Sequence, residues 1–197
     1  MGMKFASIHL YDPAREVTME EFRRTYMNEL HNVERECKER CRNLHALFGE
    51  EVSQEDEAKL LRMMEAELKE IEFERLGEWL TAYDTNYTFE TIEPAAQAFS
   101  SVVDLPILFS AVFDGDILLF GVCLKGEIVT RHILGGFFAR RAYGLMKQRA
   151  DVQQLCEMLN LKNKSLVEQL CRQRHVGKAV KQLETLLGIR LYRHIEK

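Results

Sequence analysis

The chain has 197 residues, of which 46 % are hydrophobic, and a formal net charge of −4 at pH 7. This length and composition suit one sizeable core with an appendage and exclude a disordered polymer. No apolar run approaches the roughly 18 residues that a membrane span requires, and the amino terminus lacks a basic segment followed by an apolar one. We therefore expect a cytoplasmic protein with no membrane partner.

The first expected element is a strand at about residues 3–10, with Phe5, Ser7 and His9 on one face. A T-x-x-E pattern from Thr18 to Glu21 is a capping box and predicts the start of a helix.

Apolar residues then recur at three- and four-residue steps, and a second capping signal at Ser53 begins another such stripe. Residues 18–77 therefore predict a long amino-terminal helical hairpin. Its first helix would be longer than a small domain is wide. We expect this arm to mediate a homodimer.

A short strand at 79–83 and a helix from Pro94 to about Val102 are expected next. Three apolar runs follow at 107–113, 117–124 and 127–133, and they predict an antiparallel three-stranded meander.

Asp114-Gly115 and Lys125-Gly126 are the turns of this meander, because their residues tolerate positive φ. Two-residue turns would pair Phe109 with Phe120 and Leu124 with Glu127. Both faces of the middle strand are apolar, so we expect material packed on both sides of the sheet.

Four helices are expected after the meander, at 137–147, 152–159, 166–171 and 176–187, with Gly188 ending the last. The predicted fold is α+β. An antiparallel core spans residues 1–136, including the arm, and a carboxyl-terminal helical subdomain spans residues 137–197.

The two parts differ in charge. Residues 139–197 hold 13 Lys and Arg against 5 Asp and Glu, whereas residues 1–138 hold 14 against 26. The basic part could meet nucleic acid or an acidic protein, or could pair with the acidic part of the same chain.

Two patterns resemble known proteins. The first is a W-x-x-x-Y-D strand that begins at Trp79, followed by a V-F-D-x-D-x-L-L-F hairpin that begins at Val112. These patterns resemble a set of uncharacterised bacterial proteins. The resemblance implies that these residues form strands of a sheet, and it implies no particular activity.

The second pattern runs from Val176 to Tyr192, VGKAVKQLETLLGIRLY. It is similar to the recognition-helix end of LysR-type transcriptional regulators. The resemblance implies a helix in the major groove of DNA, positioned by basic residues that contact the backbone. The candidate contacts are Lys178, Lys181, Arg190 and Arg193. The alternative is an amphipathic helix that packs on the core.

Three carboxylates are candidates for a divalent-cation site at the sheet edge: Asp84, Asp114 and Asp116. The alternative is turn chemistry, since Asp is favoured in tight loops for local hydrogen bonding. An Asp116–His132 dyad is not expected, because alternation along the strands separates the two side chains.

Cys37, Cys41 and His45 have helical spacing and could form half of a soft-metal site, or the cysteines could fill a core. The five cysteines are odd in number, which favours reduced thiols. No P-loop, G-x-S-x-G or G-x-G-x-x-G motif occurs in the sequence. We therefore expect no cofactor and no enzymatic activity.

The leading hypothesis is a non-enzymatic protein-interaction or regulatory module. A DNA-binding regulator acting through the basic carboxyl-terminal helices is the first alternative. A metal-dependent enzyme using the three aspartates is the second.

Overall fold

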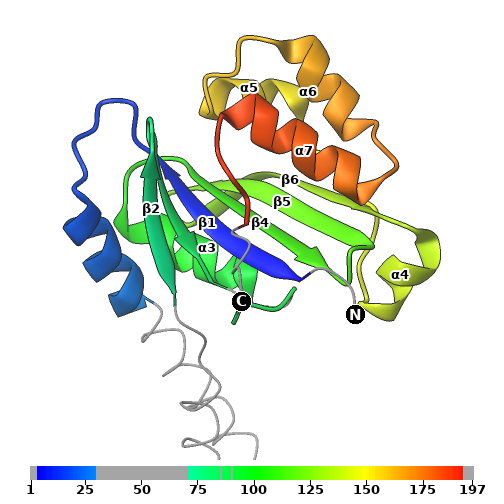
Figure 1. Ribbon diagram of the computed structural model, residues 1–197, viewed down its shortest axis with the longest axis horizontal. Helices are drawn as coiled ribbons and strands as arrows, with labels where there is room; N and C mark the ends of the chain where they lie inside the picture. Colours follow the sequence, from blue (N-terminus) through cyan, green and yellow to red (C-terminus); the bar gives the residue numbers. More distant parts are fainter. Residues whose placement is uncertain (1–3, 30–70, 85, 90, 193–197) are drawn as a thin grey trace, which may run out of the picture.

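The computed structural model describes residues 4–29, 71–84, 86–89 and 91–192. The described chain is α+β, as predicted, with a six-stranded antiparallel sheet in the order β2-β3-β1-β4-β5-β6 (Figure 1). The strands are β1 Phe5–Tyr11, β2 Glu72–Leu76, β3 Trp79–Tyr83, β4 Ile107–Phe113, β5 Ile117–Leu124 and β6 Glu127–Gly135.

The end of the predicted helical arm is a strand, so the expectation of helix up to residue 77 is wrong. Residues 72–76 form β2 and pair with β3, with Leu76 opposite Trp79. The period-two pattern of Glu72-Phe73-Glu74 suits a strand, and Gly77 supplies the positive φ of 61° that the tight turn needs. Residues 30–70, which hold most of the predicted arm, lie outside the described residues.

The predicted turn has the expected backbone, since Asp114 and Gly115 both have positive φ, but it spans three residues, 114–116, rather than two. The predicted register between the strands it joins is wrong by one residue. Phe113 lies opposite Ile117 rather than Asp116, and Phe109 lies opposite Gly121 rather than Phe120. The Phe109 ring takes the space above the glycine, because a Cβ at position 121 would lie 2.5 Å from Cζ of Phe109.

The second turn, at Lys125-Gly126, joins β5 to β6 with Leu124 opposite Glu127, as predicted. An irregularity then follows, because Cys123 pairs with Ile128 whereas Val122 pairs with Thr130. The extra residue places His132 opposite Phe120, not opposite Leu119 as the regular register predicted.

Helices cover both faces of the sheet (Figure 1). One face packs against the helical residues 19–29 and α3, Ile92–Val102. We call this the aromatic face, because the rings of Phe22, Tyr26, Phe73 and Phe99 meet there at centroid distances of 5.5 to 6.2 Å.

The opposite face packs against the three carboxyl-terminal helices. These are α5 Val152–Met158, α6 Lys164–Cys171 and α7 Val176–Leu187. We call it the polar-network face, because Ser7, His9, Thr81 and Ser110 are buried and hydrogen-bonded together there. Helices on both sides explain why β5 is apolar on both faces.

The connection after β6 forms a shorter helix than predicted. Helix α4 covers Phe137–Ala142 and ends well before Lys147. Gly144 has a positive φ of 64°, which breaks the helical path. None of the helices within the described ranges is long and apolar enough to cross a membrane.

Side-chain caps fix the start of the helix at residues 19–29. Glu21 accepts hydrogen bonds from the Thr18 backbone N–H at 2.9 Å, and Thr18 Oγ1 accepts from the Glu21 N–H at 3.2 Å, which confirms the capping box. The buried Asp12 carboxylate accepts from the N–H groups of Glu16 and Val17 and lies 3.6 Å from Arg75 of β2. The segment that leads into this helix is therefore held beside the turn end of the β2–β3 hairpin.

Candidate functional site

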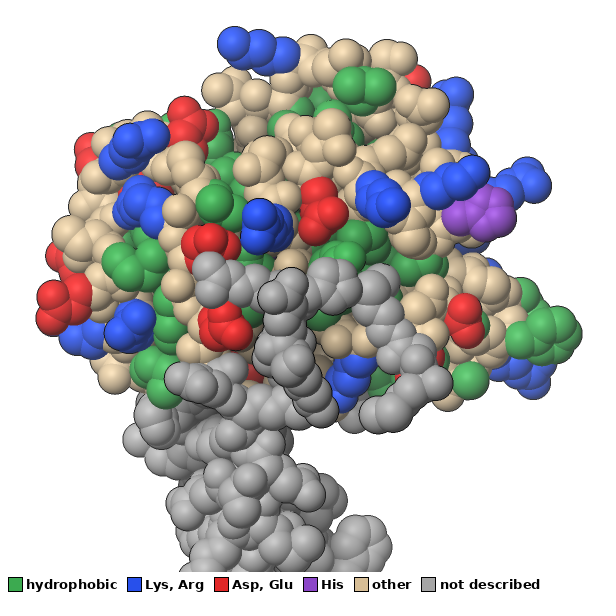
Figure 2. Space-filling view, viewed as in Figure 1, with side chains coloured by type: hydrophobic (Ala, Val, Ile, Leu, Met, Phe, Trp, Pro, Cys, Tyr) green, Lys and Arg blue, Asp and Glu red, His purple; other side chains and the backbone are tan. Residues whose placement is uncertain are grey.

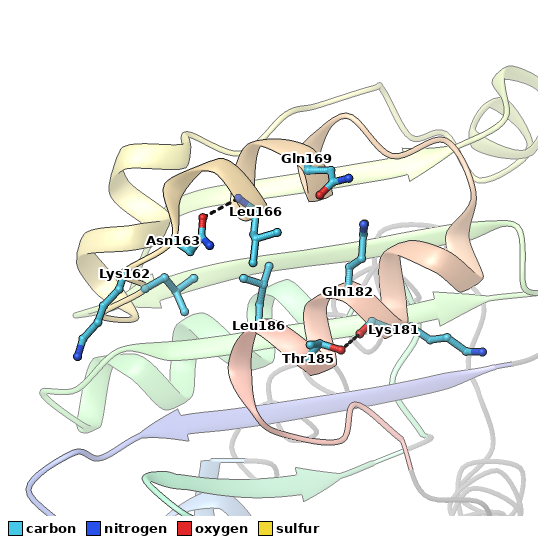
Figure 3. Close-up of a pocket in the computed structure, with 9 residues that line it drawn as sticks. Lys162, Asn163, Leu166, Gln169, Lys181, Gln182, Thr185 and Leu186 are labelled. Atoms are coloured by element: carbon cyan, nitrogen blue, oxygen red, sulfur yellow. Dashed lines mark hydrogen bonds between the residues drawn. The ribbon is translucent and has the colours of Figure 1, made fainter.

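A groove lies on the outer surface of the carboxyl-terminal subdomain, between α6 and α7 (Figure 3). Its volume is about 420 Å³. Leu166 of α6 and Leu186 of α7 point toward one another across it, and Leu161 adds to the apolar floor. The remaining lining residues are Lys162, Asn163, Gln169, Lys181, Gln182 and Thr185.

Local sequence explains why these leucines face outward. Helix α7 buries Val176, Val180, Leu183 and Leu187 against the sheet. Adjacent helical residues point about 100° apart, so Leu186 cannot share that buried direction with Leu187. On α6, Asn163 caps the helix by accepting a hydrogen bond from the Leu166 N–H at 3.2 Å. This cap places Leu166 on the first turn with 45 % of its surface exposed.

The rim of the groove is polar and basic. Lys162 and Lys181 lie at its two ends, and their side chains extend outward in Figure 3. Asp and Glu are absent from its nine lining residues. The amide side chains of Gln169 and Gln182 can donate and accept hydrogen bonds. The groove thus combines an apolar floor with a rim that suits an anionic or polar ligand surface.

The candidate nucleic-acid contacts from the sequence lie on the same subdomain. Lys178 and Lys181 are exposed on α7, and Arg190 is exposed just after it, whereas Arg193 lies outside the described residues. Figure 2 shows Lys and Arg side chains over the carboxyl-terminal helices on this side of the molecule. Lys181 also lines the groove.

The three candidate aspartates have different environments. Asp84 is fully buried, and its Oδ2 lies 3.1 Å from the hydroxyl of Tyr26, which is also 2.9 Å from the Tyr87 hydroxyl oxygen. Asp114 and Asp116 are exposed in the β4–β5 turn, where Asp114 accepts a hydrogen bond from Tyr143.

These aspartates do not converge on a common point. Among the described residues, no three His, Cys, Asp or Glu side chains are placed to share a metal ion. Burial, followed by the neighbouring Tyr87 and Asp84, raises the pKa of Tyr26 well above its usual value. Asp84 therefore joins the helix at residues 19–29 to the end of β3 through a neutral phenol.

The polar-network face holds the side chains closest in type to a catalytic set. His9 Nε2 lies 2.8 Å from Ser7 Oγ, and His9 Nδ1 lies 2.9 Å from Thr81 Oγ1. The Ser7 hydroxyl is also 2.8 Å from that of Ser110. None of these four residues has exposed surface. A nucleophile needs access to its substrate, so this network is a structural element of the core.

Burial keeps both core histidines neutral. It lowers the pKa of His9 from 6.5 to about 3 and is the main cause that lowers the pKa of His132 to about 4. The sequence placed Ser7 and His9 on one face of a strand, but it gave no sign of Thr81 or Ser110 as their partners. Those partners come from strands 72 and 103 residues away.

The described cysteines are free thiols. Burial raises the pKa of Cys123 to about 12 and that of Cys171 to about 11, so both are protonated and unreactive at neutral pH. The proposed soft-metal half-site of Cys37, Cys41 and His45 lies outside the described residues.

The groove itself was not predicted from the sequence. Leu166 and the Leu186-Leu187 pair were visible as helical leucines, and the pair alone indicates that one leucine must leave the buried stripe. Comparison with known proteins finds no matching family model, no matching curated protein and no matching solved structure. The function is therefore argued from the groove and its surroundings.

Proposed function

We propose that this protein is a non-enzymatic interaction module that binds an acidic amphipathic helix of a partner protein in the α6–α7 groove. The observation that carries the proposal is the leucine pair in the groove, the exposed Leu166 and the half-buried Leu186, between two lysines and with no acidic residue in the lining.

The shape of the groove favours a helical ligand. Two roughly adjacent helices with apolar side chains between them form the kind of surface into which a third helix lays its apolar stripe. The anchors of such a ligand recur at i, i+3 or i+4 and i+7 and lie on one face of the helix, which would contact Leu161, Leu166 and Leu186. Lys162 and Lys181 at the ends would then select acidic residues that flank the stripe and would speed association.

A designed peptide of about 15 residues tests this, long enough to form a helix when bound. One version carries leucines at helical spacing with glutamates elsewhere, and the matched version replaces every glutamate by lysine. The full chain should bind the acidic peptide with micromolar affinity and the basic one at least about tenfold more weakly, by fluorescence anisotropy. Equal binding of the two peptides would contradict the proposed selectivity.

Variants locate the binding. Leu166→Ser with Leu186→Ser removes the floor and should weaken acidic-peptide binding by about tenfold or more. Val102→Ser is the matched control, because Val102 is 53 % exposed at the end of α3, outside the groove lining. Unchanged affinity in the double variant, with native thermal stability, would show that the groove is not the binding site.

A second copy of this chain is one partner with suitable chemistry. Residues 50–57 hold five Asp and Glu and no Lys or Arg. We propose a homodimer involving residues 18–77, supported by the charge asymmetry between the two parts of the chain. Sedimentation at micromolar concentration should give twice the mass of the 23.0 kDa chain. A monomer alone at that concentration would end the homodimer proposal.

DNA binding is the second candidate function, favoured by the exposure of Lys178, Lys181 and Arg190 on and after α7. It predicts that the logarithm of the affinity falls linearly with the logarithm of the salt concentration. Lys178→Glu with Lys181→Glu should abolish this binding while leaving Leu166 and Leu186 intact. Absence of duplex binding at low salt would reject this candidate.

A further inference from the structure

We propose that the corner formed by α4 and the following loop, residues 137–149, is a contact site for an anionic lipid bilayer. This site is separate from the groove, which lies in another part of the molecule. The proposal departs from the expectation that the chain has no membrane partner. A surface contact of this kind needs no membrane-spanning helix.

Large apolar side chains are concentrated at this corner. The exposed fractions are 61 % for Phe137, 84 % for Phe138 and 83 % for Met146. Only two other large hydrophobic side chains in the described parts of the chain are comparably exposed, Val102 and Leu166. Two adjacent exposed phenylalanines on one short helix are unusual for a surface that meets only water.

The charged side chains within residues 137–149 are all cationic, although the exposed Asp114 of the neighbouring β4–β5 turn contacts Tyr143. Residues 137–149 hold Arg140, Arg141, Lys147 and Arg149 and no Asp or Glu, although the whole chain has a net charge of −4. Arg141, Lys147 and Arg149 are exposed. Figure 2 shows hydrophobic and basic side chains together at the edge of the molecule where α4 lies.

The segment that carries the exposed rings contacts the rest of the molecule at two points. Tyr143 packs its ring 5.1 Å from that of Phe89 and 6.1 Å from that of Phe113, and its hydroxyl donates to Asp114. Farther along, the Ile133 N–H donates to the Gln148 carbonyl at 2.9 Å. The segment is thus attached at Tyr143 and at Gln148, and the two phenylalanines before these residues are exposed.

The pattern favours a lipid surface over a protein groove. A helix that docks in a groove uses side chains at i and i+3 or i+4, which lie on one face. Phe137 and Phe138 are consecutive, so they point in different directions, and their rings meet edge to face at 5.5 Å. Two rings that point in different directions can both insert into a fluid lipid interface, and the surrounding cations pair with anionic headgroups.

Vesicle flotation with the full chain tests the proposal. Vesicles of phosphatidylcholine with about 30 % phosphatidylserine should bind the protein, and phosphatidylcholine alone should bind it at least about tenfold more weakly. Binding should fall in about 0.5 M salt, where the charges are screened. Equal binding to the two compositions, or binding to neither, would overturn the proposal.

Two double variants test whether residues 137–149 make the contact with the vesicle. Phe137→Ser with Phe138→Ser should reduce partitioning at least about tenfold, because it removes the apolar wedge. Arg141→Glu with Lys147→Glu should reduce it by more than about tenfold, since each lost cation alone contributes roughly fivefold. All four residues are exposed, so the variants should melt like the wild type.

Matched controls lie elsewhere on the surface. Val102→Ser changes an exposed apolar residue, and Lys164→Glu with Arg174→Glu reverses two exposed charges on the carboxyl-terminal subdomain. Neither control should change vesicle binding more than about twofold. If the controls lower binding as much as the corner variants, the attraction is a general charge effect and the site is wrong. If vesicles fail and the two phenylalanines instead prove necessary for self-association, the corner is a protein interface.

Discussion

The two faces of the sheet are built by different means. On the aromatic face, Phe22, Tyr26 and Phe99 interlock by shape, and Tyr26 brings one polar group that reaches Asp84. On the polar-network face, His9 has both ring nitrogens in hydrogen bonds beneath the carboxyl-terminal helices. Removing a ring from the aromatic face leaves a cavity, whereas removing one member of the hydrogen-bonded network leaves a buried polar atom without a partner. The comparison therefore predicts different failures on the two sides.

The largest effect should come from the aromatic face. Phe99→Ala removes a ring that is 1 % exposed and contacts the rings of both Phe22 and Tyr26. It should lower the free energy of unfolding by about 3–5 kcal/mol, measured by urea denaturation. Phe138→Ala is the matched control and should change it by less than about 0.5 kcal/mol, because that ring is exposed. Similar losses in both variants would refute this account of the core.

A smaller effect is expected from the network. Thr81→Val keeps the shape of the side chain but deprives His9 Nδ1 of its partner. The unfolding free energy should fall by about 1–3 kcal/mol, the cost of an unsatisfied buried polar atom. Thr185→Val, on the exposed side of α7, is the control and should be nearly neutral. A neutral Thr81→Val would mean that the network contributes little to stability.

The third prediction concerns the protonation of His9, whose effect on stability is spread over several pH units. Its folded pKa of about 3 lies below the unfolded value of 6.5, so the unfolded chain binds the extra proton between these values. The stability contributed by neutral His9 is complete above pH 6.5 and is lost as the pH falls toward 3, by at most about 1.4 kcal/mol per pH unit. His9→Asn should flatten the stability profile between pH 6 and pH 4 relative to the wild type. Parallel profiles would show that His9 is not the titrating group.

The parts of the fold that could be predicted depend on local backbone chemistry. Asp114-Gly115 and Lys125-Gly126 tolerate positive φ, so the two turns were found from the sequence alone. The predicted register of β5 was wrong because a two-residue turn was assumed where three residues, 114–116, separate Phe113 from Ile117. A strand that is apolar on both faces offers no alternation that would reveal the correct register. The pairing of Gly121 with Phe109, which depends on tertiary packing, decides it.

The candidate site was predictable only in outline. The exposed basic residues of α7, such as Lys178, follow from amphipathic spacing, because they lie opposite the buried stripe. The groove depends on how far apart α6 and α7 pack and on which leucine of a pair is buried, and neither property is local. The exposure of Phe137 and Phe138 was also hidden, since an apolar pair after a strand is equally compatible with a buried helix start.

The contacts near Asp12 and Phe73 join two segments that lie far apart in the sequence. The last described residues before position 30 and the first after position 70 belong to one packed unit, because Tyr26 and Phe73 lie with ring centroids 5.6 Å apart. Packing of described side chains therefore holds residues 26 and 73 together, although they are far apart in the sequence.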